Sequence, residues 1–159
     1  MMSDAEVAAF LQGVELAAVA VYQQASAVLG SPAAVASAQS FVAHHRAHAR
    51  AFGELAGGFA VVVAPEAALD ALQPVAPLVS EHDGLTLLSA VEARLAATQH
   101  AMLGRLTSTP SIALVATTLP VECQHGVVLG TLLSQPLAQL VPTTQGDDGR
   151  LTPQPLAGS

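Results

Sequence analysis

An internal repeat is the sequence feature that most constrains the fold of this chain. Two halves match at an offset of 77 positions, which pairs Glu15 with Glu92, His45 with Glu122, and His48 with His125. Residues three apart, such as Glu122 and His125, share one face of a helix. A fixed-offset repeat indicates two similar structural units. Here it places six candidate metal ligands at matching positions of the two halves.

The first half predicts two helices. Ser3 and Glu6 have the spacing of a capping box, so we expect a helix over residues 4–29 that ends at Gly30. Ser31 and Pro32 predict the start of a second helix that runs to about residue 56. The inward-facing rows, spaced by threes and fours, are Leu11, Glu15, Ala18, Tyr22, Ala25 and Leu29, then Phe41, His45, His48, Phe52 and Leu55.

The second half predicts two more helices, over about residues 84–106 and 109–134. Asp83 is the expected cap of the first, and Thr109-Pro110 opens the second. Their inward rows are Leu88, Glu92, Leu95, Gln99, Met102 and Leu106, then Val115, Thr118, Glu122, His125, Leu129 and Leu132. Pro120 falls inside the last helix, so either that helix kinks there or it starts later.

The segment between the halves, residues 57–83, is rich in proline and lacks a sustained period. Loops this long need a structural reason. A long crossover between a second and a third helix that run in the same direction provides one. We expect a short helical turn within it over residues 65–72. Residues 1–134 are then one helical domain, and residues 135–159 are an irregular tail.

The six candidate ligands interrupt rows that are otherwise apolar. A glutamate in a core-facing row must be neutralised or paired. The alternative for Glu15 is that it faces water and that the phase of this alanine-rich helix is misread. A single histidine in such a row is usually a hydrogen-bonded core residue. Two histidines facing a glutamate of the neighbouring helix favour metal ligands instead.

Composition excludes some classes of function. The chain has 12 acidic residues, five basic residues and a net charge of −7, which argues against nucleic acid as a partner. A single cysteine, Cys123, excludes an internal disulfide and a cysteine-rich zinc site. Hydrophobic residues reach 52%, yet no uninterrupted apolar run has the length of a membrane span. We therefore expect no membrane span, and a homo-oligomer (a dimer or larger) that covers apolar surface.

The N-terminal sequence Met-Met-Ser-Asp-Ala-Glu lacks the basic and apolar regions of a signal peptide. We therefore expect a cytoplasmic protein. An exported precursor with a further leader stays open as the alternative.

The two ligand segments, Phe-Val-Ala-His-His-Arg-Ala-His-Ala and Leu-Pro-Val-Glu-Cys-Gln-His, resemble those of small bacterial ferritin-like proteins. Over residues 4–134 the chain resembles the ferritin-like di-iron carboxylate superfamily. This resemblance implies an antiparallel four-helix bundle with a long crossover between its second and third helices. It also implies a metal site built from Glu15, His45, His48, Glu92, Glu122 and His125. Iron is the implied metal, with manganese or zinc as alternatives.

His45 departs from the family pattern, which has a glutamate at this position of the second helix. Imidazole cannot bridge two metals as a carboxylate does. Two divalent cations would then exceed the charge of three carboxylates by one, unless a hydroxide or another anion is added. A mononuclear and a dinuclear site therefore both stay open. The resemblance implies ferroxidase or peroxide-consuming (oxidoreductase) activity, which this replacement puts in question.

The alternative function is a structural or interaction bundle with a degenerate, metal-free site. In that case the histidines would serve as the ionic partners of the glutamates. A third hypothesis, a three-histidine site that includes His44 and His48, has no support from the repeat. We expect a role for His44 behind the ligands or at the surface. Tyr22 is expected to be a core residue with a satisfied hydroxyl, and Cys123 a buried, inert thiol.

Overall fold

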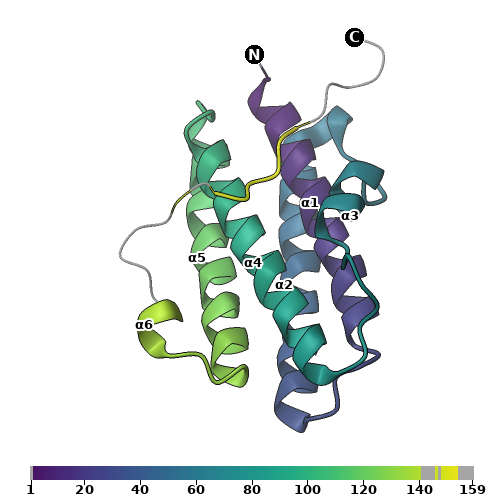
Figure 1. Cartoon of the computed structure of the whole chain (residues 1–159). Helices are drawn as coiled ribbons and strands as arrows, with labels where there is room; N and C mark the ends of the chain where they lie inside the picture. The colour runs from purple at the N-terminus through teal and green to yellow at the C-terminus, as the bar shows by residue number, and fades with distance from the viewer. Residues whose placement is uncertain (1, 141–145, 147, 154–159) are drawn as a thin grey trace.

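A computed structural model describes residues 2–140, 146 and 148–153 of the chain (Figure 1). The regular elements within these residues are α1 (Asp4–Ala25), α2 (Pro32–Ala56), the 3₁₀-helix η1 (Gly57–Phe59), α3 (Glu66–Leu72), α4 (Glu81–Leu103), α5 (Thr109–Leu132) and α6 (Leu137–Leu140). The predicted all-α class is confirmed for this part of the chain. The predicted irregular tail contains α6 and otherwise lies partly outside the described residues.

The long helices lie side by side (Figure 1). α1 packs along α2 and α4 packs along α5, so that each half of the repeat forms one pair of helices. The two pairs meet through contacts of α1 with α4 and of α2 with α5. The short α3 covers α1, and α6 packs against the end of α5. All four long helices therefore contribute residues to one interior.

Several helix starts agree with the sequence. The Ser3 hydroxyl accepts a hydrogen bond from the Glu6 amide at 3.3 Å, and the Glu6 carboxylate accepts one from the Ser3 amide at 2.7 Å. This is the predicted capping box. Ser31 caps α2, whose first residue is Pro32, and α2 ends at Ala56 as expected. The helical turn predicted within the long connection is present as α3.

The end of α1 was predicted four residues too late. After Ser26 the amides of Ala27 and Val28 bond carbonyls three residues back rather than four, which closes the helix at Ala25. The amide of Gly30 bonds the Glu81 carboxylate at 2.6 Å instead. Tight turns and a contact to a distant helix start therefore replace the last predicted turn of α1.

The predicted start of the third long helix was also wrong. α4 begins at Glu81 because Ser80, not Asp83, is the N-cap. The Ser80 hydroxyl accepts from the Asp83 amide at 3.2 Å and donates to the Asp83 carboxylate at 2.7 Å. Asp83 thus acts as the acidic partner three residues inside the helix. α4 ends at Leu103, just before Gly104, which is three residues earlier than predicted.

α5 begins at Thr109, as predicted, and runs without interruption through Pro120, so the alternative of a later start is excluded. Its cap is Ser108, whose hydroxyl accepts from the Ser111 amide, and its second residue is Pro110. α5 ends at Leu132, shortly before Ser134 adopts a φ of 57°. The side chain of Pro120 is exposed, so its ring displaces no packed core group.

Two apolar clusters form the core, and a polar layer lies between them. The larger cluster includes Val21, Phe41, Leu88 and Leu129, and the smaller includes Leu11, Phe52, Met102 and Val115. The buried polar residues of this layer separate the two clusters along α2 and α5, whereas on α1 and α4 Glu15 and Glu92 lie among members of the larger cluster. These polar residues are Glu15, His45, Glu92, Thr98, Gln99, Thr118, Glu122 and His125. The repeat therefore creates a cross-section of the core that is rich in charge.

Among the residues that the structure describes, two helices, α1 and α5, are long and apolar enough to cross a membrane, by length and composition alone. The apolar window of α1 is 67% buried inside the protein, as expected of a core helix, whereas that of α5 is 28% buried. The sequence showed no uninterrupted apolar run because polar residues such as Glu122 divide α5. The predictions of no membrane span and of a homo-oligomer stay predictions.

Candidate metal centre

The six predicted ligands lie together in the polar layer. α1 supplies Glu15, α2 supplies His45 and His48, α4 supplies Glu92, and α5 supplies Glu122 and His125. Five of them are at most 2% exposed, and the side chain of His48 is 12% exposed. Burial of Glu15 at 1% exposure excludes the alternative that it faces water.

The cluster contains two overlapping groups whose ligand atoms lie within 4.8 Å of one another. One group is Glu15, His45, His48 and Glu122, and the other is His45, Glu92, Glu122 and His125. Each group offers two imidazole nitrogens and two carboxylate oxygens. Donors of this kind suit iron, manganese and zinc. The geometry is therefore compatible with a metal site.

His45 lies at the centre of the cluster. Its Nδ1 is 2.8 Å from Oε2 of Glu15, and its Nε2 is 3.1 Å from Oε1 of Glu92. Nδ1 is also 3.8 Å from Oε2 of Glu122. A ring that donates to carboxylates through both nitrogens carries a positive charge. The pKa of His45 is accordingly raised well above its usual 6.5, because Glu92 and Glu15 outweigh the cost of burial.

His48 and His125 face the cluster through Nδ1. Nδ1 of His48 lies 2.9 Å from Oε1 of Glu122, and Nδ1 of His125 lies 3.2 Å from Oε2 of Glu92. Burial lowers the pKa of His48, but hydrogen bonds to Glu122 and Glu15 raise it to about 9. The pKa of His125 is also raised, by Glu122 and Glu92 against burial. Imidazoles thus surround the carboxylates from two sides.

Glu92 is the carboxylate most strongly affected by these imidazoles. Its complete burial would raise its pKa, but the charge of His45 and the hydrogen bond from His125 lower it to about 2. A carboxylate with such a low pKa stays ionised throughout the physiological range. The cluster therefore presents an anionic oxygen at neutral pH in a water-poor interior.

Tyr22 and Gln99 lie on the inward rows of opposite halves, and each donates a hydrogen bond to a glutamate of the other half. The Tyr22 hydroxyl on α1 donates a hydrogen bond to Oε1 of Glu92 on α4. The Gln99 amide on α4 donates to Oε1 of Glu15 on α1 at 2.9 Å. The hydroxyl of Thr118 donates to the Gln99 carbonyl at 2.7 Å and fixes the direction of that amide. Tyr22 and Gln99 match at the repeat offset, which was the only sequence signal for this support.

His44 contacts the cluster from its exposed edge. Its Nδ1 lies 2.8 Å from Nε2 of His125, and the two rings stack with centroids 5.1 Å apart. On the inner side, Phe41 stacks on the His125 ring with centroids 3.9 Å apart. His44 belongs to neither candidate ligand group. The expected role behind the ligands is therefore the one its contacts favour, and the three-histidine hypothesis is not supported.

The two remaining sequence expectations differ in outcome. Tyr22 is buried at 0% exposure and its hydroxyl has a partner, as expected, although that partner is a carboxylate of the cluster. Cys123 was expected to be buried, and this was wrong, because its side chain is exposed. It follows Glu122 directly on α5 and so points about 100° away from the cluster.

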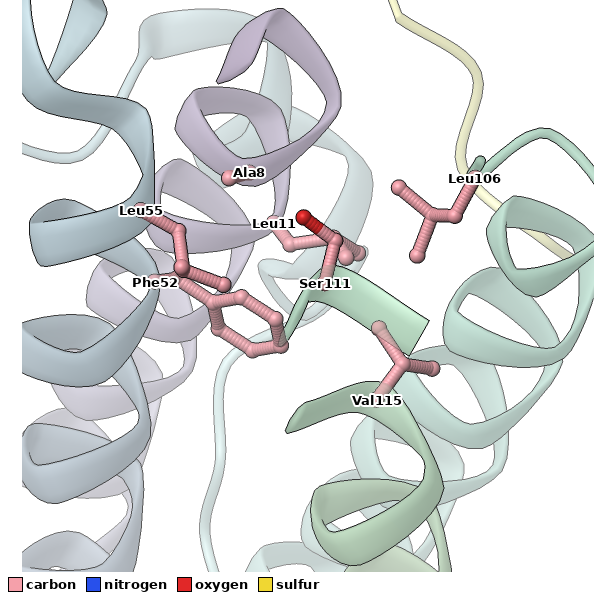
Figure 2. A pocket seen from close by; sticks show the side chains of 7 residues that line it. All are labelled: Ala8, Leu11, Phe52, Leu55, Leu106, Ser111 and Val115. Atoms are coloured by element: carbon pink, nitrogen blue, oxygen red, sulfur yellow. The ribbon is translucent and has the colours of Figure 1, made fainter. Parts of the chain in front are cut away.

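A small apolar hollow lies within the smaller core cluster, between α1, α2 and α5 (Figure 2). It is lined by Ala8, Leu11, Phe52, Leu55, Leu106, Ser111 and Val115. The Ser111 hydroxyl is its polar group, and it already accepts a hydrogen bond from Ser108 at 2.8 Å. With no titratable side chain in its lining, this hollow offers no chemistry of its own. The polar cluster is therefore the candidate functional site.

No protein-family model, no curated protein and no solved structure matches this chain. The class defined by the fold and the site is therefore an all-helical protein with a buried carboxylate and histidine cluster.

Proposed function

We propose that this chain is a ferritin-like four-helix protein that binds divalent metal ions in the buried cluster. The pairing of α1 with α2 and of α4 with α5 supports this topology. So does the connection of residues 57–80, which leads from one end of the helices to the other (Figure 1). The donor set of three carboxylates and three imidazoles suits iron, manganese and zinc, and the resemblance to ferritin-like proteins favours iron among them.

The observation that carries this proposal is a buried oxygen of Glu122 that accepts no hydrogen bond within the described residues. Oε2 of Glu122 is buried and accepts no hydrogen bond from the residues that the structure describes. A buried carboxylate oxygen without a hydrogen bond is costly, particularly when ionised. It lies between the two candidate ligand groups, 3.4 Å from Nδ1 of His125 and 3.8 Å from Nδ1 of His45. A cation bound there would satisfy it.

The protein's own residues determine how such an ion would be held. Glu15, Glu92 and Glu122 supply the negative charge, and His48 and His125 supply neutral nitrogen donors once they lose their protons. Tyr22 and Gln99 hold two of the carboxylates in place from the opposite helix pair. A bound iron ion would supply the redox chemistry expected of a ferroxidase or a peroxide-consuming enzyme.

A metal-free structural bundle is the second candidate, and one observation favours it. Every buried glutamate of the cluster already has an imidazole partner: His45 lies 2.8 Å from Glu15 and 3.1 Å from Glu92, and His48 lies 2.9 Å from Glu122. In this case the protonated imidazoles take the place of cations. Metal ions and protonated imidazoles then compete for the same carboxylates. Metal binding and a metal-free structural role can therefore be distinguished by experiment.

Equilibrium dialysis against ferrous iron, manganese or zinc, followed by elemental analysis, tests the proposal. We expect the wild type to bind at least one ion per chain. Glu122→Gln should lower the affinity at least tenfold, because this residue belongs to both ligand groups. Glu54→Gln removes an exposed carboxylate of α2 and is the matched control that should bind like the wild type. Equal binding by both variants, or none by the folded wild type, would overturn the proposal.

A further inference from the structure

The two nitrogens of His45 face different carboxylates. Nδ1 lies 2.8 Å from Glu15, and Nε2, on the other edge of the ring, lies 3.1 Å from Glu92. The ring is 0% exposed, so neither nitrogen has access to solvent. A histidine that serves one metal uses one nitrogen and turns the other toward a supporting acceptor. In this protein both acceptors are themselves candidate ligands.

The other candidate ligands also divide into two sets, one that contains Glu15 and one that contains Glu92. Glu15 and His48 belong to one candidate group, and Glu92 and His125 belong to the other. Glu122 has one oxygen near each set, since Oε1 lies 2.9 Å from Nδ1 of His48 and Oε2 lies 3.4 Å from Nδ1 of His125. His45 and Glu122 are the two residues that both groups share. Glu15 of one group thus lies at the Nδ1 edge of the His45 ring, and Glu92 of the other group lies at the Nε2 edge.

We propose that His45 joins two divalent cations, with Nδ1 bound to one and Nε2 to the other. This inference rests on the metal-binding function proposed above and deepens it. The first cation would be held by Glu15, His48, Glu122 and Nδ1 of His45. The second would be held by Glu92, His125, Glu122 and Nε2 of His45. The residue that replaces the family's bridging glutamate is then itself the bridge.

The charge balance agrees with this arrangement. A ring that binds metals through both nitrogens has released both of its N–H protons to solvent and is an imidazolate anion. Three carboxylates and one imidazolate balance two divalent cations, so no additional hydroxide is needed. With a neutral His45, the same two cations would leave an unbalanced positive charge in a buried site. The histidine therefore supplies the fourth negative charge once the metals are bound.

The bridge also determines how far apart the ions lie. The width of the ring and two metal–nitrogen bonds of about 2.0–2.1 Å separate them by more than the roughly 3.5–4 Å of common two-metal sites. Each ion would have two nitrogen and two oxygen donors, a set that suits tetrahedral zinc. Zinc also binds such donors more tightly than ferrous iron or manganese does. Zinc is therefore the most sensitive probe of this arrangement.

Crystals of the full chain grown with zinc, measured at the zinc absorption edge, test the bridge directly. We expect two anomalous peaks per chain, one about 2.0–2.1 Å from Nδ1 of His45 and one at the same distance from Nε2. One peak, or two peaks of which only one contacts His45, would overturn the bridge and leave the metal-binding function intact. A protein without any zinc would overturn both.

Zinc stoichiometry in solution gives an independent test. After dialysis against equal free zinc, the wild type should hold two ions per chain and His45→Gln should hold one, because an amide cannot serve both sites. Arg46→Gln is the control: it introduces the same residue at the exposed neighbouring position and should hold two. A His45→Gln variant that still holds two ions would contradict the bridge. If that variant does not fold, the wild-type crystals decide.

Discussion

The hydroxyl of Tyr22 on α1 donates a hydrogen bond to the buried carboxylate of Glu92 on α4. Its repeat counterpart Gln99 on α4 donates to Glu15 on α1. Each helix pair therefore fixes the glutamate of the other pair by a residue seven positions after its own glutamate. The contacts connect the two halves of the core, so the polar layer contributes to the fold as well as to the site.

Tyr22→Phe should destabilise the protein by about 1.5–3 kcal/mol, because it removes a hydrogen bond to a charged acceptor in the interior. Urea unfolding of the metal-free protein measures this loss. Glu92 keeps its imidazole partners in the variant, so the fold should persist. In a Glu92→Gln background the same substitution should cost less, and an equal cost in both backgrounds would show that the hydroxyl does not act through Glu92.

Metal should stabilise the native protein. An ion that binds only the folded state, at about a hundred times its dissociation constant, adds about 2.7 kcal/mol. For a chain of this size, that free energy corresponds to a rise in Tm of about 5–10 °C. Thermal unfolding with and without zinc or ferrous iron measures the rise. A Tm unchanged by iron, manganese and zinc would favour the metal-free structural bundle.

The stability of the metal-free protein should be greatest between about pH 4.5 and 6.5. The pKa of Glu92 is lowered from 4.5 to about 2, so its contribution is complete above pH 4.5 and is lost as the pH falls toward 2. The pKa of His48 is raised from 6.5 to about 9, so its contribution is complete below pH 6.5 and is lost as the pH rises through 9. Urea unfolding in chelator from pH 3 to 9 measures the profile. Stability that rises from pH 6.5 to 9 would contradict these ion pairs.

Above pH 6.5, metal affinity should rise with pH, whereas the stability of the metal-free protein should fall. Imidazole binds metal only after it loses its proton, so binding displaces protons from His45, His48 and His125. Zinc binding should therefore strengthen as the pH rises from 6 to 9, while the metal-free protein loses stability. Isothermal titration at several pH values measures this. Affinity that is independent of pH would show that the metal does not replace these protons.

His45→Glu separates the metal-bound from the metal-free account. Without metal, a fourth carboxylate would replace the cation between Glu15 and Glu92, and the loss of a buried ionic partner costs about 3–5 kcal/mol. With metal bound, the cations should neutralise the additional carboxylate, and the stability of the variant should be restored. Arg46→Glu introduces the same residue at an exposed site and should change stability by about 0.5 kcal/mol or less. A His45→Glu protein as stable as the wild type in chelator would contradict the structure of the cluster.

The repeat predicted the helices and the clustering of the six candidate ligands because a fixed offset carries three-dimensional information. Glu15 and Glu92 could be matched without knowing the loop between them. The helix ends were less predictable. Ser80 became a cap through its contacts with Asp83, and α1 ended early because of local turns and the contact of Gly30 with Glu81.

Side-chain contacts between different helices could not be predicted from the sequence either. His44 and Thr118 act through residues far along the chain, His125 and Gln99, and no spacing within one helix reveals such partners. The exposure of Cys123 could not be predicted because it depends on which faces of α5 other helices cover, and the sequence of α5 does not reveal this. The position of both His45 nitrogens between two glutamates required the coordinates of α1, α2 and α4 together.

The metal content of the protein as isolated tests the central claim most directly. The chain would be purified without chelator and its iron, manganese and zinc counted per chain by elemental analysis, beside Glu122→Gln prepared in the same way. We expect one to two divalent ions per wild-type chain and a clear loss in the variant. A folded wild-type protein that contains none of these metals, and takes up none when they are supplied, would contradict the account.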